Sequence, residues 1–338
     1  MKYVLTGATG FVGGAYLKHL LARDEEVTII SRRSGGTEWL RRAGASVIVA
    51  DLESRESLRK LDFRGSIVVH CAGFASHFGR TADSSRGNLV AAQNLVAAVG
   101  QHRPRRFVFV SCAQVYGPAV NGQTVSSAST APMPARYNAV AINKLAAERV
   151  VLERCTADGI APVTLRLGHL YGGGEVSDTL VSDAKVGELD VFGDGANRLP
   201  LLHVDDAVSA IDKAATHPRA VGHVFDVASD ERVTQRQFVE SLGACLGLKP
   251  TIRTIPIAKA RSAATWAGMR AGLFGARQRT SHTWVDWFTC DMQLDCTAIE
   301  SDLGWSAEVT LAEGMRRTRV RLEALRSPPM YAAGSGRF

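Results

Sequence analysis

The sequence predicts an α/β fold in which a doubly wound parallel sheet carries a smaller, mixed lobe near the carboxyl end of the chain. Three observations predict it. Short β-branched runs alternate with segments of helical period through the first half of the chain, which is typical of βαβ units. A glycine-rich turn, TGATGFVGG, separates the first strand from the first helix. After about residue 170 the alternation loosens, and Gly, Pro and Asp become more prominent.

Each predicted strand is a short run rich in Val, Ile or Phe, and each predicted helix fills the interval between two strands. The strands expected in the sheet are Lys2–Thr6, Glu26–Ile30, Ser46–Ala50, Ile67–His70, Phe107–Ser111 and Val163–Leu167. The helices expected between them are Phe11–Ala22, Thr37–Ala43, Ser54–Leu61, a long one near Gly87–His102, and Asn138–Thr156. Because parallel crossovers are right-handed, these units place helices on both faces of the sheet.

The glycine-rich turn predicts a dinucleotide site of the Rossmann type. Gly7 permits the tight turn, Gly10 lets the backbone approach a pyrophosphate, and Gly13 lets the helix pack close to the strand. The free N–H groups at the start of the helix favour phosphate. The cofactor-binding residues expected in this loop are Gly7, Thr9, Gly10, Phe11, Val12 and Gly13.

The end of the second strand favours NADP(H) over NAD. This strand closes with Ser31, Arg32 and Arg33, without the carboxylate that would bind the ribose 2′-hydroxyl of NAD. Guanidinium groups and a hydroxyl suit a 2′-phosphate, which a carboxylate would repel. Further nucleotide contacts are expected where the third and fourth strands end, at Asp51, Leu52, Cys71, Ala72 and Gly73.

The later part of the chain is interpreted as an interleaved substrate lobe on the carboxyl edge of the sheet. Helices are expected near Thr234–Leu246 and Ile257–Phe274, separated by short strands such as Val224–Val227. Residues 1–170 would form the NADP-binding domain, with sheet elements recurring near 200–228, and residues 171–326 the substrate-binding lobe. Residues 327–338 are expected to form a flexible tail.

Composition limits the class of protein. No uncharged apolar run in the 338 residues reaches the length of a membrane span. The six cysteines are scattered and lack a CxxC pair, which predicts reduced thiols and no metal site. Nothing after Met1 resembles a leader sequence. Together these two observations predict a cytoplasmic location.

The formal net charge of +7 is matched by one segment, residues 249–279, which holds seven basic residues and no acidic one. A basic patch confined to one segment does not predict nucleic-acid binding, which a uniformly basic chain would suggest. It fits a solvated helix face, an anion site or peripheral contact with a membrane.

These motifs resemble the extended short-chain dehydrogenase/reductase superfamily, in its sterol-dehydrogenase-like, NAD-dependent epimerase/dehydratase group. The resemblance covers roughly residues 1–325 and rests further on VVHCAG, FVFVSCAQVYG, NKLAAERVV, LRLGHLYGGG, LPLLHVDDAVSAI and DLGWSAEVTLAEGMRRT. It implies a bound nicotinamide nucleotide, a substrate lobe built from the later segments, and a homodimer formed through the two long helices. The cofactor contacts that it adds are Asn88, Lys144, Leu167 and His169.

The same resemblance implies a catalytic triad that is altered here. The family uses a tyrosine as general acid/base, a lysine four residues later, and a Ser or Thr on the fifth strand. NKLAAERVV identifies Lys144, so Val140 occupies the tyrosine position, and SCAQVYG puts Cys112 at the serine position. A valine cannot donate a proton, whereas a thiol donates weakly and can act as a nucleophile if its pKa is lowered.

Three other side chains are candidates for the missing acid/base. Tyr137 lies seven residues before Lys144, which on a helix is about 10.5 Å along the axis, so the two would share a face without touching unless a bulge shortened the distance. His77 follows the fourth strand and His169 follows the sixth, both where the chain would face a nicotinamide. An imidazole suits acid/base work at neutral pH.

The function that we expect is NADP(H)-dependent interconversion of a ketone and an alcohol in a hydrophobic small molecule, in biosynthesis. A nucleotide sugar is not favoured, because LRLGHLYGGG lacks an Arg-Phe-Asn pattern. Two alternatives stay open. One is a redox-neutral cyclase, isomerase or dehydratase that uses Cys112 or a histidine, and the other is a noncatalytic NADP(H)-binding sensor.

Overall fold

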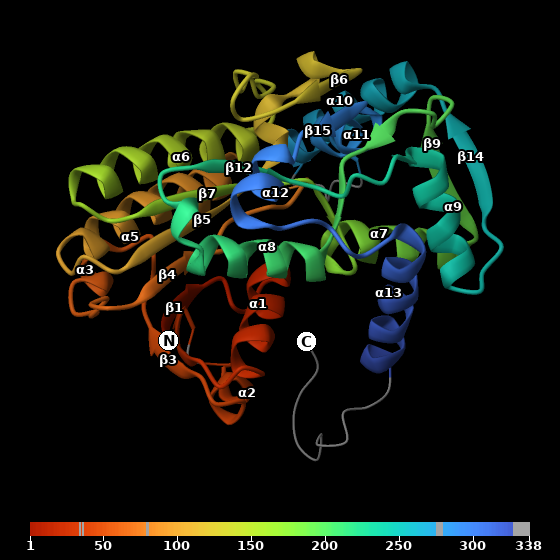
Figure 1. The fold of residues 1–338 in the computed structure, drawn as a ribbon. Helices are drawn as coiled ribbons and strands as arrows, with labels where there is room; N and C mark the ends of the chain where they lie inside the picture. Colours follow the sequence, from red (N-terminus) through yellow and green to blue (C-terminus); the bar gives the residue numbers. More distant parts are fainter. Residues whose placement is uncertain (34, 36, 79–80, 275–279, 327–338) are drawn as a thin grey trace.

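The central sheet is parallel and doubly wound (Figure 1). The computed structural model describes residues 1–33, 35, 37–78, 81–274 and 280–326. Within these ranges, seven strands pair in the order β12-β7-β5-β4-β1-β2-β3. They are β1 (Lys2–Thr6), β2 (Glu26–Ser31), β3 (Ser46–Val49), β4 (Ile67–His70), β5 (Arg106–Cys112), β7 (Pro162–Leu167) and β12 (Val224–Val227). The chain winds outward from β1 in both directions, which confirms the predicted fold class.

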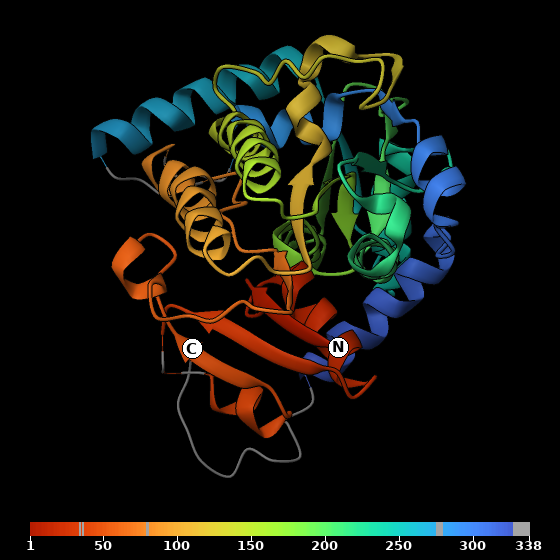
Figure 2. The same ribbon diagram turned by 60° about the vertical axis from the view of Figure 1, so that its left-hand side comes forward.

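Helices cover both faces of the sheet because its strands are apolar on both sides. In β1, Tyr3 and Leu5 join the core under α1 and α8, whereas Val4 joins the core under α5 and α6. Figures 1 and 2 show α5 and α6 side by side on their face. The helices of this part are α1 (Phe11–Leu21), α2 (Glu38–Arg42), α3 (Arg55–Leu58), α4 (Thr81–Ser84), α5 (Ala91–Gly100), α6 (Ala139–Ala157) and α8 (Val204–Thr216).

Two helices differ from their predicted bounds by more than one residue. The helix expected near Gly87–His102 starts earlier, because α4 runs through a π-helical turn, Ser85–Val90, into α5. The helix expected over Ser54–Leu61 is limited to α3. Leu61 and Phe63 are both buried in the same core, and side chains two residues apart cannot share one helix face, so the chain leaves the helix before them.

The smaller lobe has its own apolar core, formed by α7, α9, α10, α11 and α13 around β9. The remaining elements of the later part of the chain are β8 (His169–Tyr171), α7 (Gly174–Val186), β9 (Glu188–Phe192), β10 (Arg198–Leu199), β11 (Leu201–His203), β13 (Val233–Thr234), α9 (Gln235–Cys245), β14 (Thr251–Ile255), α10 (Ile257–Phe274), α11 (His282–Thr289), β15 (Met292–Leu294), α12 (Thr297–Leu303) and α13 (Leu311–Arg326). The strand β15 pairs with β6 (Gln123–Val125). Helix α12 packs against β12 and joins the core of the central sheet through Ile299 and Leu303. The strand β12 lies between α8 and β13 in the sequence, within this later part of the chain, but it forms the edge strand of the central sheet. The division of the chain at residue 170 stays a prediction.

The basic segment is partly neutralised by acids from other elements. Arg253 pairs with Glu188 and Asp190, and Arg261 pairs with Asp286. Arg277, Arg279 and the predicted tail, 327–338, lie outside the described residues.

Three further features of the described part bear on the sequence predictions. All six cysteines fall within it as free thiols. No group of three or more His, Cys, Asp or Glu side chains in these ranges could hold a metal ion. None of the described helices has both the length and the apolar character needed to cross a membrane.

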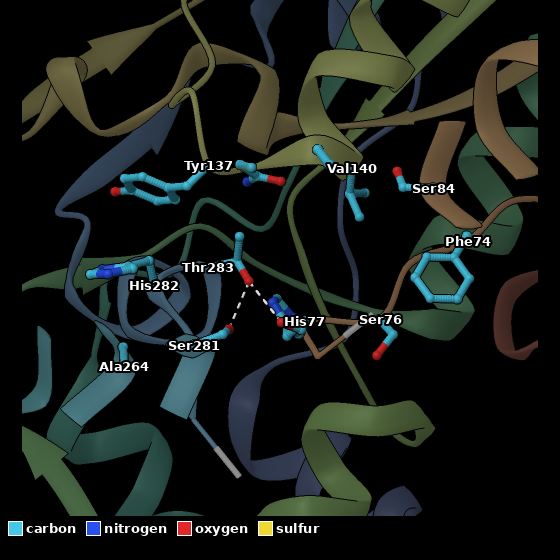
Figure 3. Close-up of a pocket in the computed structure, with 13 residues that line it drawn as sticks. Phe74, Ser76, His77, Ser84, Tyr137, Val140, Ala264, Ser281, His282 and Thr283 are labelled. Atoms are coloured by element: carbon cyan, nitrogen blue, oxygen red, sulfur yellow. Dashed lines mark hydrogen bonds between the residues drawn. The ribbon is translucent and has the colours of Figure 1, made fainter. Parts of the chain in front are cut away.

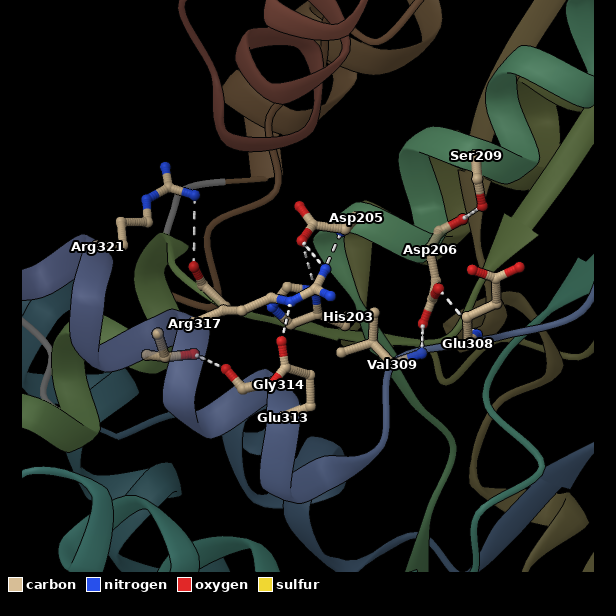
Figure 4. A network of polar contacts seen from close by, with 12 residues as sticks. His203, Asp205, Asp206, Ser209, Glu308, Val309, Glu313, Gly314, Arg317 and Arg321 are labelled. Carbon is tan, nitrogen blue, oxygen red and sulfur yellow. Dashed lines mark hydrogen bonds and ion pairs between the residues drawn. The ribbon is translucent and has the colours of Figure 1, made fainter.

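A buried carboxylate ties the segment just before α13 to the sheet layer (Figure 4). Asp206, on α8, accepts hydrogen bonds from the backbone N–H groups of Glu308 and Val309, each at 3.1 Å. Its neighbour Asp205 instead points to Arg317 of α13, at 2.7 Å, from a half-exposed position. The two adjacent aspartates therefore differ in burial and in partner, because Asp206 is buried against backbone N–H groups and Asp205 is half exposed beside a guanidinium.

Replacing Asp206 should destabilise the fold far more than replacing Asp205. Asp206→Ala leaves two backbone donors without their acceptor and should lower the free energy of unfolding by roughly 2–3 kcal/mol. Asp205→Ala removes only a surface ion pair and should cost less than about 1 kcal/mol. Urea unfolding followed by circular dichroism measures both. Equal losses would contradict this assignment.

Candidate functional site

The turn between β1 and α1 has the shape of a phosphate cradle. Gly7 has a φ of +75°, and a Cβ there would lie 2.5 Å from the backbone nitrogen of Ala72. A Cβ on Gly13 would lie 2.3 Å from the carbonyl oxygen of Gly7. The N-cap of α1 is Gly10, which has no side chain to satisfy the first N–H groups of the helix. The loop thus leaves backbone donors for a pyrophosphate.

The end of β2 carries a cluster of charges around one carboxylate. Arg32 lies 3.8 Å from Glu53, and Arg86, from the π-helical turn, lies 3.3 Å from the same carboxylate. The hydroxyl of Ser31 donates to the carbonyl oxygen of Arg33 at 3.1 Å. Arg86 was not anticipated from the sequence, because only the fold brings it to this strand end.

The next strand end is organised by side-chain contacts to the backbone. Asp51 accepts a hydrogen bond from the backbone N–H of Glu53 at 3.0 Å, and Asn94 donates to the carbonyl oxygen of Leu52 at 2.9 Å. The two residues that the sequence assigned to nucleotide binding here are thereby fixed in place at the carboxyl edge of the sheet.

Lys144 lies at the centre of the predicted cofactor site. It is 7% exposed, and its Nζ donates to the carbonyl oxygen of Val110 at 2.7 Å. A Cβ on Gly73 would lie 3.1 Å from Nζ and 2.6 Å from Oδ1 of Asn88. Asn88 in turn holds both the N–H and the C=O of Phe74, at 3.1 and 2.9 Å. The structure thus brings Lys144, Gly73 and Asn88 together, and burial lowers the pKa of Lys144.

The two cysteines near Lys144 are neutral thiols. Burial raises the pKa of Cys112 to about 11 and that of Cys71 to about 12, against the opposing influence of the Lys144 charge. At neutral pH both therefore keep their protons. A thiolate nucleophile at Cys112 is not favoured by this environment.

Tyr137 lies just outside helix α6. Asn138 caps that helix by accepting a hydrogen bond from the N–H of Ala141 at 3.0 Å, so the helical spacing considered for Tyr137 and Lys144 does not apply. The Tyr137 hydroxyl donates to Asp286 of α11 at 2.6 Å. Burial, and then this carboxylate, raises the pKa of Tyr137. Its hydroxyl is engaged with the smaller lobe.

The two candidate histidines pack against tryptophans of α11. His169 is 4% exposed and stacks on Trp287, with ring centroids 4.4 Å apart. Burial lowers its pKa to about 3, so its imidazole is neutral at physiological pH, and its Nδ1 has no partner within the described residues. The His77 ring meets Trp284 edge-on, with centroids 5.6 Å apart. Leu167, the remaining predicted cofactor contact, is buried at the end of β7.

A pocket of about 250 Å³ opens beside Val140, between the loop after β4, the start of α6 and the lobe helices α10 and α11 (Figure 3). Its lining residues are Phe74, Ser76, His77, Ser84, Tyr137, Asn138, Ala139, Val140, Ala264, Gly268, Ser281, His282 and Thr283. Cys112 and His169 are not among them. Ser84 and His282 were not anticipated, because no motif marks them in the sequence.

Behind the site, a buried network of charges connects three strands of the sheet with α6. Arg166 of β7 makes a two-pronged contact with Glu148 of α6, the shorter bond being 2.8 Å, and also donates to the Tyr116 hydroxyl at 3.0 Å. Tyr116 donates to Asp226 of β12 at 2.8 Å. Ser111 of β5 donates to Glu148 at 2.5 Å. The sequence analysis did not anticipate this network, although Arg166 and Asp226, as charged residues inside otherwise apolar strands, could have indicated it.

The sequence also matches a known family. The sequence model described as the NAD dependent epimerase/dehydratase family matches residues 3–228, about two thirds of the 338 residues. The chain belongs to this family. The resemblance inferred from the motifs is thereby confirmed, and members of the family include oxidoreductases, epimerases and dehydratases.

Individual relatives of this family member are distant. A 2-alkyl-3-oxoalkanoate reductase of Shewanella oneidensis is 23% identical over 334 residues, covering 94% of this chain and 85% of the reductase. A dTDP-glucose 4,6-dehydratase of Streptomyces niveus is 26% identical over 369 residues, covering 99% of each chain. The structure of the UDP-glucose 4-epimerase of Thermotoga maritima superposes with a TM-score of 0.76 at 20% identity, over 96% of this chain and 99% of the epimerase. The superposition shows that this chain and the epimerase share a fold.

The buried network should make stability depend on pH through Asp226. The Arg166 guanidinium pairs directly with Glu148 and is linked to Asp226 only through the Tyr116 hydroxyl, and burial raises the pKa of Asp226 to about 6. Because this exceeds the ordinary value of 3.8, the folded state binds the proton more tightly than the unfolded state. The contribution of Asp226 is therefore fully present below about pH 4 and is lost as the pH rises through about 6.

An Asp226→Asn variant should show this effect. Relative to the variant, the wild type should lose about 2–3 kcal/mol of unfolding free energy between pH 4 and pH 7. Urea unfolding at a series of pH values measures it. Parallel pH profiles for the two proteins would contradict the prediction.

Proposed function

We propose that this protein is an NADP(H)-dependent oxidoreductase that interconverts a ketone and an alcohol in a hydrophobic small molecule, with an altered proton-transfer site. One observation carries the proposal. The buried Lys144 ammonium, Gly73 and Asn88 meet at the carboxyl ends of β4 and β5, and the pocket beside Val140 opens next to them. A reducing cofactor and an organic substrate would meet at this point.

The residues present fit a dinucleotide. The first N–H groups of α1, which no N-cap side chain satisfies, would bind a pyrophosphate, and a side chain at position 73 would meet Asn88 and Lys144. When bound, a nicotinamide nucleotide supplies the hydride. Lys144 would hold the nicotinamide ribose through its ammonium, and the wall formed by Phe74 and Val140 would exclude water from the reacting carbon.

A 2′-phosphate is favoured by the charges at the end of β2. Arg32 and Arg86 both contact the Glu53 carboxylate, and Arg86 also pairs with Asp83 at 2.8 Å. Arg33 is exposed beside Arg32 in the sequence, so three guanidinium groups stand against two carboxylates. The excess is positive, which suits a dianion rather than a ribose hydroxyl.

The substrate class is suggested by the pocket and by one relative. Phe74, Val140 and Ala264 supply apolar surface, and the Shewanella oneidensis relative is named as a reductase of 2-alkyl-3-oxoalkanoates. The other lining residues are mostly polar, so the pocket offers both apolar surface and hydrogen-bonding groups, which suits a ketone that carries an alkyl chain. A homodimer in the cytoplasm is part of the same proposal.

Arg32→Ala should weaken NADPH binding selectively. Loss of one charge-assisted contact should raise the Kd for NADPH by about tenfold and leave that for NADH nearly unchanged. Glu53→Gln is the matched control, because it removes the carboxylate beside Arg32 and should tighten NADPH binding. Fluorescence of the bound nucleotide measures both. An equal rise in Kd for NADH and NADPH would contradict the assignment of the 2′-phosphate site.

Val140→Tyr should raise reductase activity. A hydroxyl at this position restores a proton donor beside the pocket and should increase kcat/KM by about tenfold or more. Val140→Phe adds the same bulk without the hydroxyl and is the control. The assay follows NADPH oxidation by a medium-chain ethyl 2-alkyl-3-oxoalkanoate. Equal rates for the Tyr and Phe variants would rule out a site that lacks only this hydroxyl.

A further inference from the structure

Ser84 places a hydroxyl in the pocket wall next to Val140. It is the last residue of α4, it is 1% exposed, and it lines the pocket from the side opposite α10 and α11 (Figure 3). Helix α4 packs against α6, which carries Val140. Ser84 and the position left without a hydroxyl at Val140 therefore belong to the same wall.

Two amide groups fix the orientation of the Ser84 hydroxyl. Its Oγ accepts one hydrogen bond from Nδ2 of Asn88 at 3.1 Å and another from Nδ2 of Asn143 at 3.3 Å. A hydroxyl oxygen has two acceptor lone pairs and one hydrogen. Both lone pairs are thus engaged, and within the described residues the hydrogen has no acceptor. Accepting two hydrogen bonds also polarises the O–H bond and strengthens it as a donor.

Three other hydroxyls of the pocket use their hydrogens within the protein. Tyr137 donates to Asp286 at 2.6 Å. Thr283 donates to the carbonyl oxygen of His77 at 3.0 Å. Because the Thr283 hydrogen is committed there, the contact of 2.9 Å between Ser281 and Thr283 must be donated by Ser281. Ser84 differs from all three, since none of the described residues accepts its hydrogen.

We propose that Ser84 donates a hydrogen bond to the carbonyl oxygen of the substrate and so replaces the donor that Val140 lacks. The inference rests on the proposed function, whose substrate it narrows to compounds that present a carbonyl oxygen toward α4. Asn88 and Asn143 are positioning residues, because they act through the Ser84 oxygen. The donor is preorganised, since neither amide has to move when the substrate arrives.

The test compares Ser84→Ala with the wild type in two measurements. The first is kcat/KM for NADPH oxidation by a medium-chain ethyl 2-alkyl-3-oxoalkanoate, which should fall about a hundredfold, while the Kd for NADPH changes less than twofold. The second is the ¹³C chemical shift of the labelled ketone carbonyl, bound to the enzyme with NADP⁺. It should move downfield on binding to the wild type and stay near its free value in the variant.

Two control variants separate contact with the substrate from loss of stability. Ser66→Ala removes another buried serine hydroxyl, which donates to the carbonyl oxygen of Phe63 at 2.7 Å far from the pocket, and should leave both measurements unchanged. In a Val140→Tyr background, Ser84→Ala should reduce kcat/KM by less than about threefold, because the tyrosine hydroxyl then supplies the donor.

The outcomes distinguish this inference from the proposed function. A bound carbonyl shift that is the same in wild type and Ser84→Ala, or that is lost in Ser76→Ala instead, overturns the role of Ser84. A downfield shift in the wild type without NADPH oxidation overturns the reductase proposal and supports the Ser84 contact. Failure of the ester to bind the wild type overturns both.

Discussion

The buried ammonium of Lys144 is the constraint around which the rest of the site is arranged. Removing a cation from water is unfavourable unless polar partners replace the solvent. Among the described residues, its one hydrogen bond is to the carbonyl oxygen of Val110, at 2.7 Å. A Cβ at position 73 would lie 3.1 Å from Nζ and 2.6 Å from Oδ1 of Asn88, so a side chain there would displace these polar groups. The buried position of the Lys144 ammonium therefore requires a residue without a side chain at position 73.

The surrounding scaffold holds Lys144 in place by cross-linking elements that are distant in the sequence. Glu148 of α6 is clamped by Arg166 of β7, so the helix that carries Lys144 is anchored to the sheet one turn beyond it. At its other end the same helix is tied to the smaller lobe through Tyr137 and Asp286. Because removing one partner from a buried ion pair is strongly destabilising, the first link fixes α6 more firmly than the half-exposed second link does.

The proton-transfer half of the site is arranged differently from the cofactor half. Cys112 is a neutral thiol, His169 is a neutral imidazole stacked on Trp287, and Tyr137 is engaged with the lobe. The π-helical turn that follows Ser84 brings Asn88 against both Phe74 and the Ser84 oxygen. At the pocket, α4 therefore contributes the Ser84 hydroxyl, whereas α6 presents Val140 where the family has a tyrosine.

The sequence by itself determined the sheet, the glycine-rich loop and the positions of Lys144 and Val140. These features depend on local periodicity and on motifs only a few residues long, and they need no knowledge of distant contacts. Only the tertiary structure decided that Tyr137 bonds Asp286, 149 residues away, and that Tyr116 bonds Asp226, 110 residues away. It also decided that Ser84 reaches the pocket. Such contacts depend on how crossovers place whole elements, because a hydroxyl in the sequence does not specify which distant group will take its hydrogen.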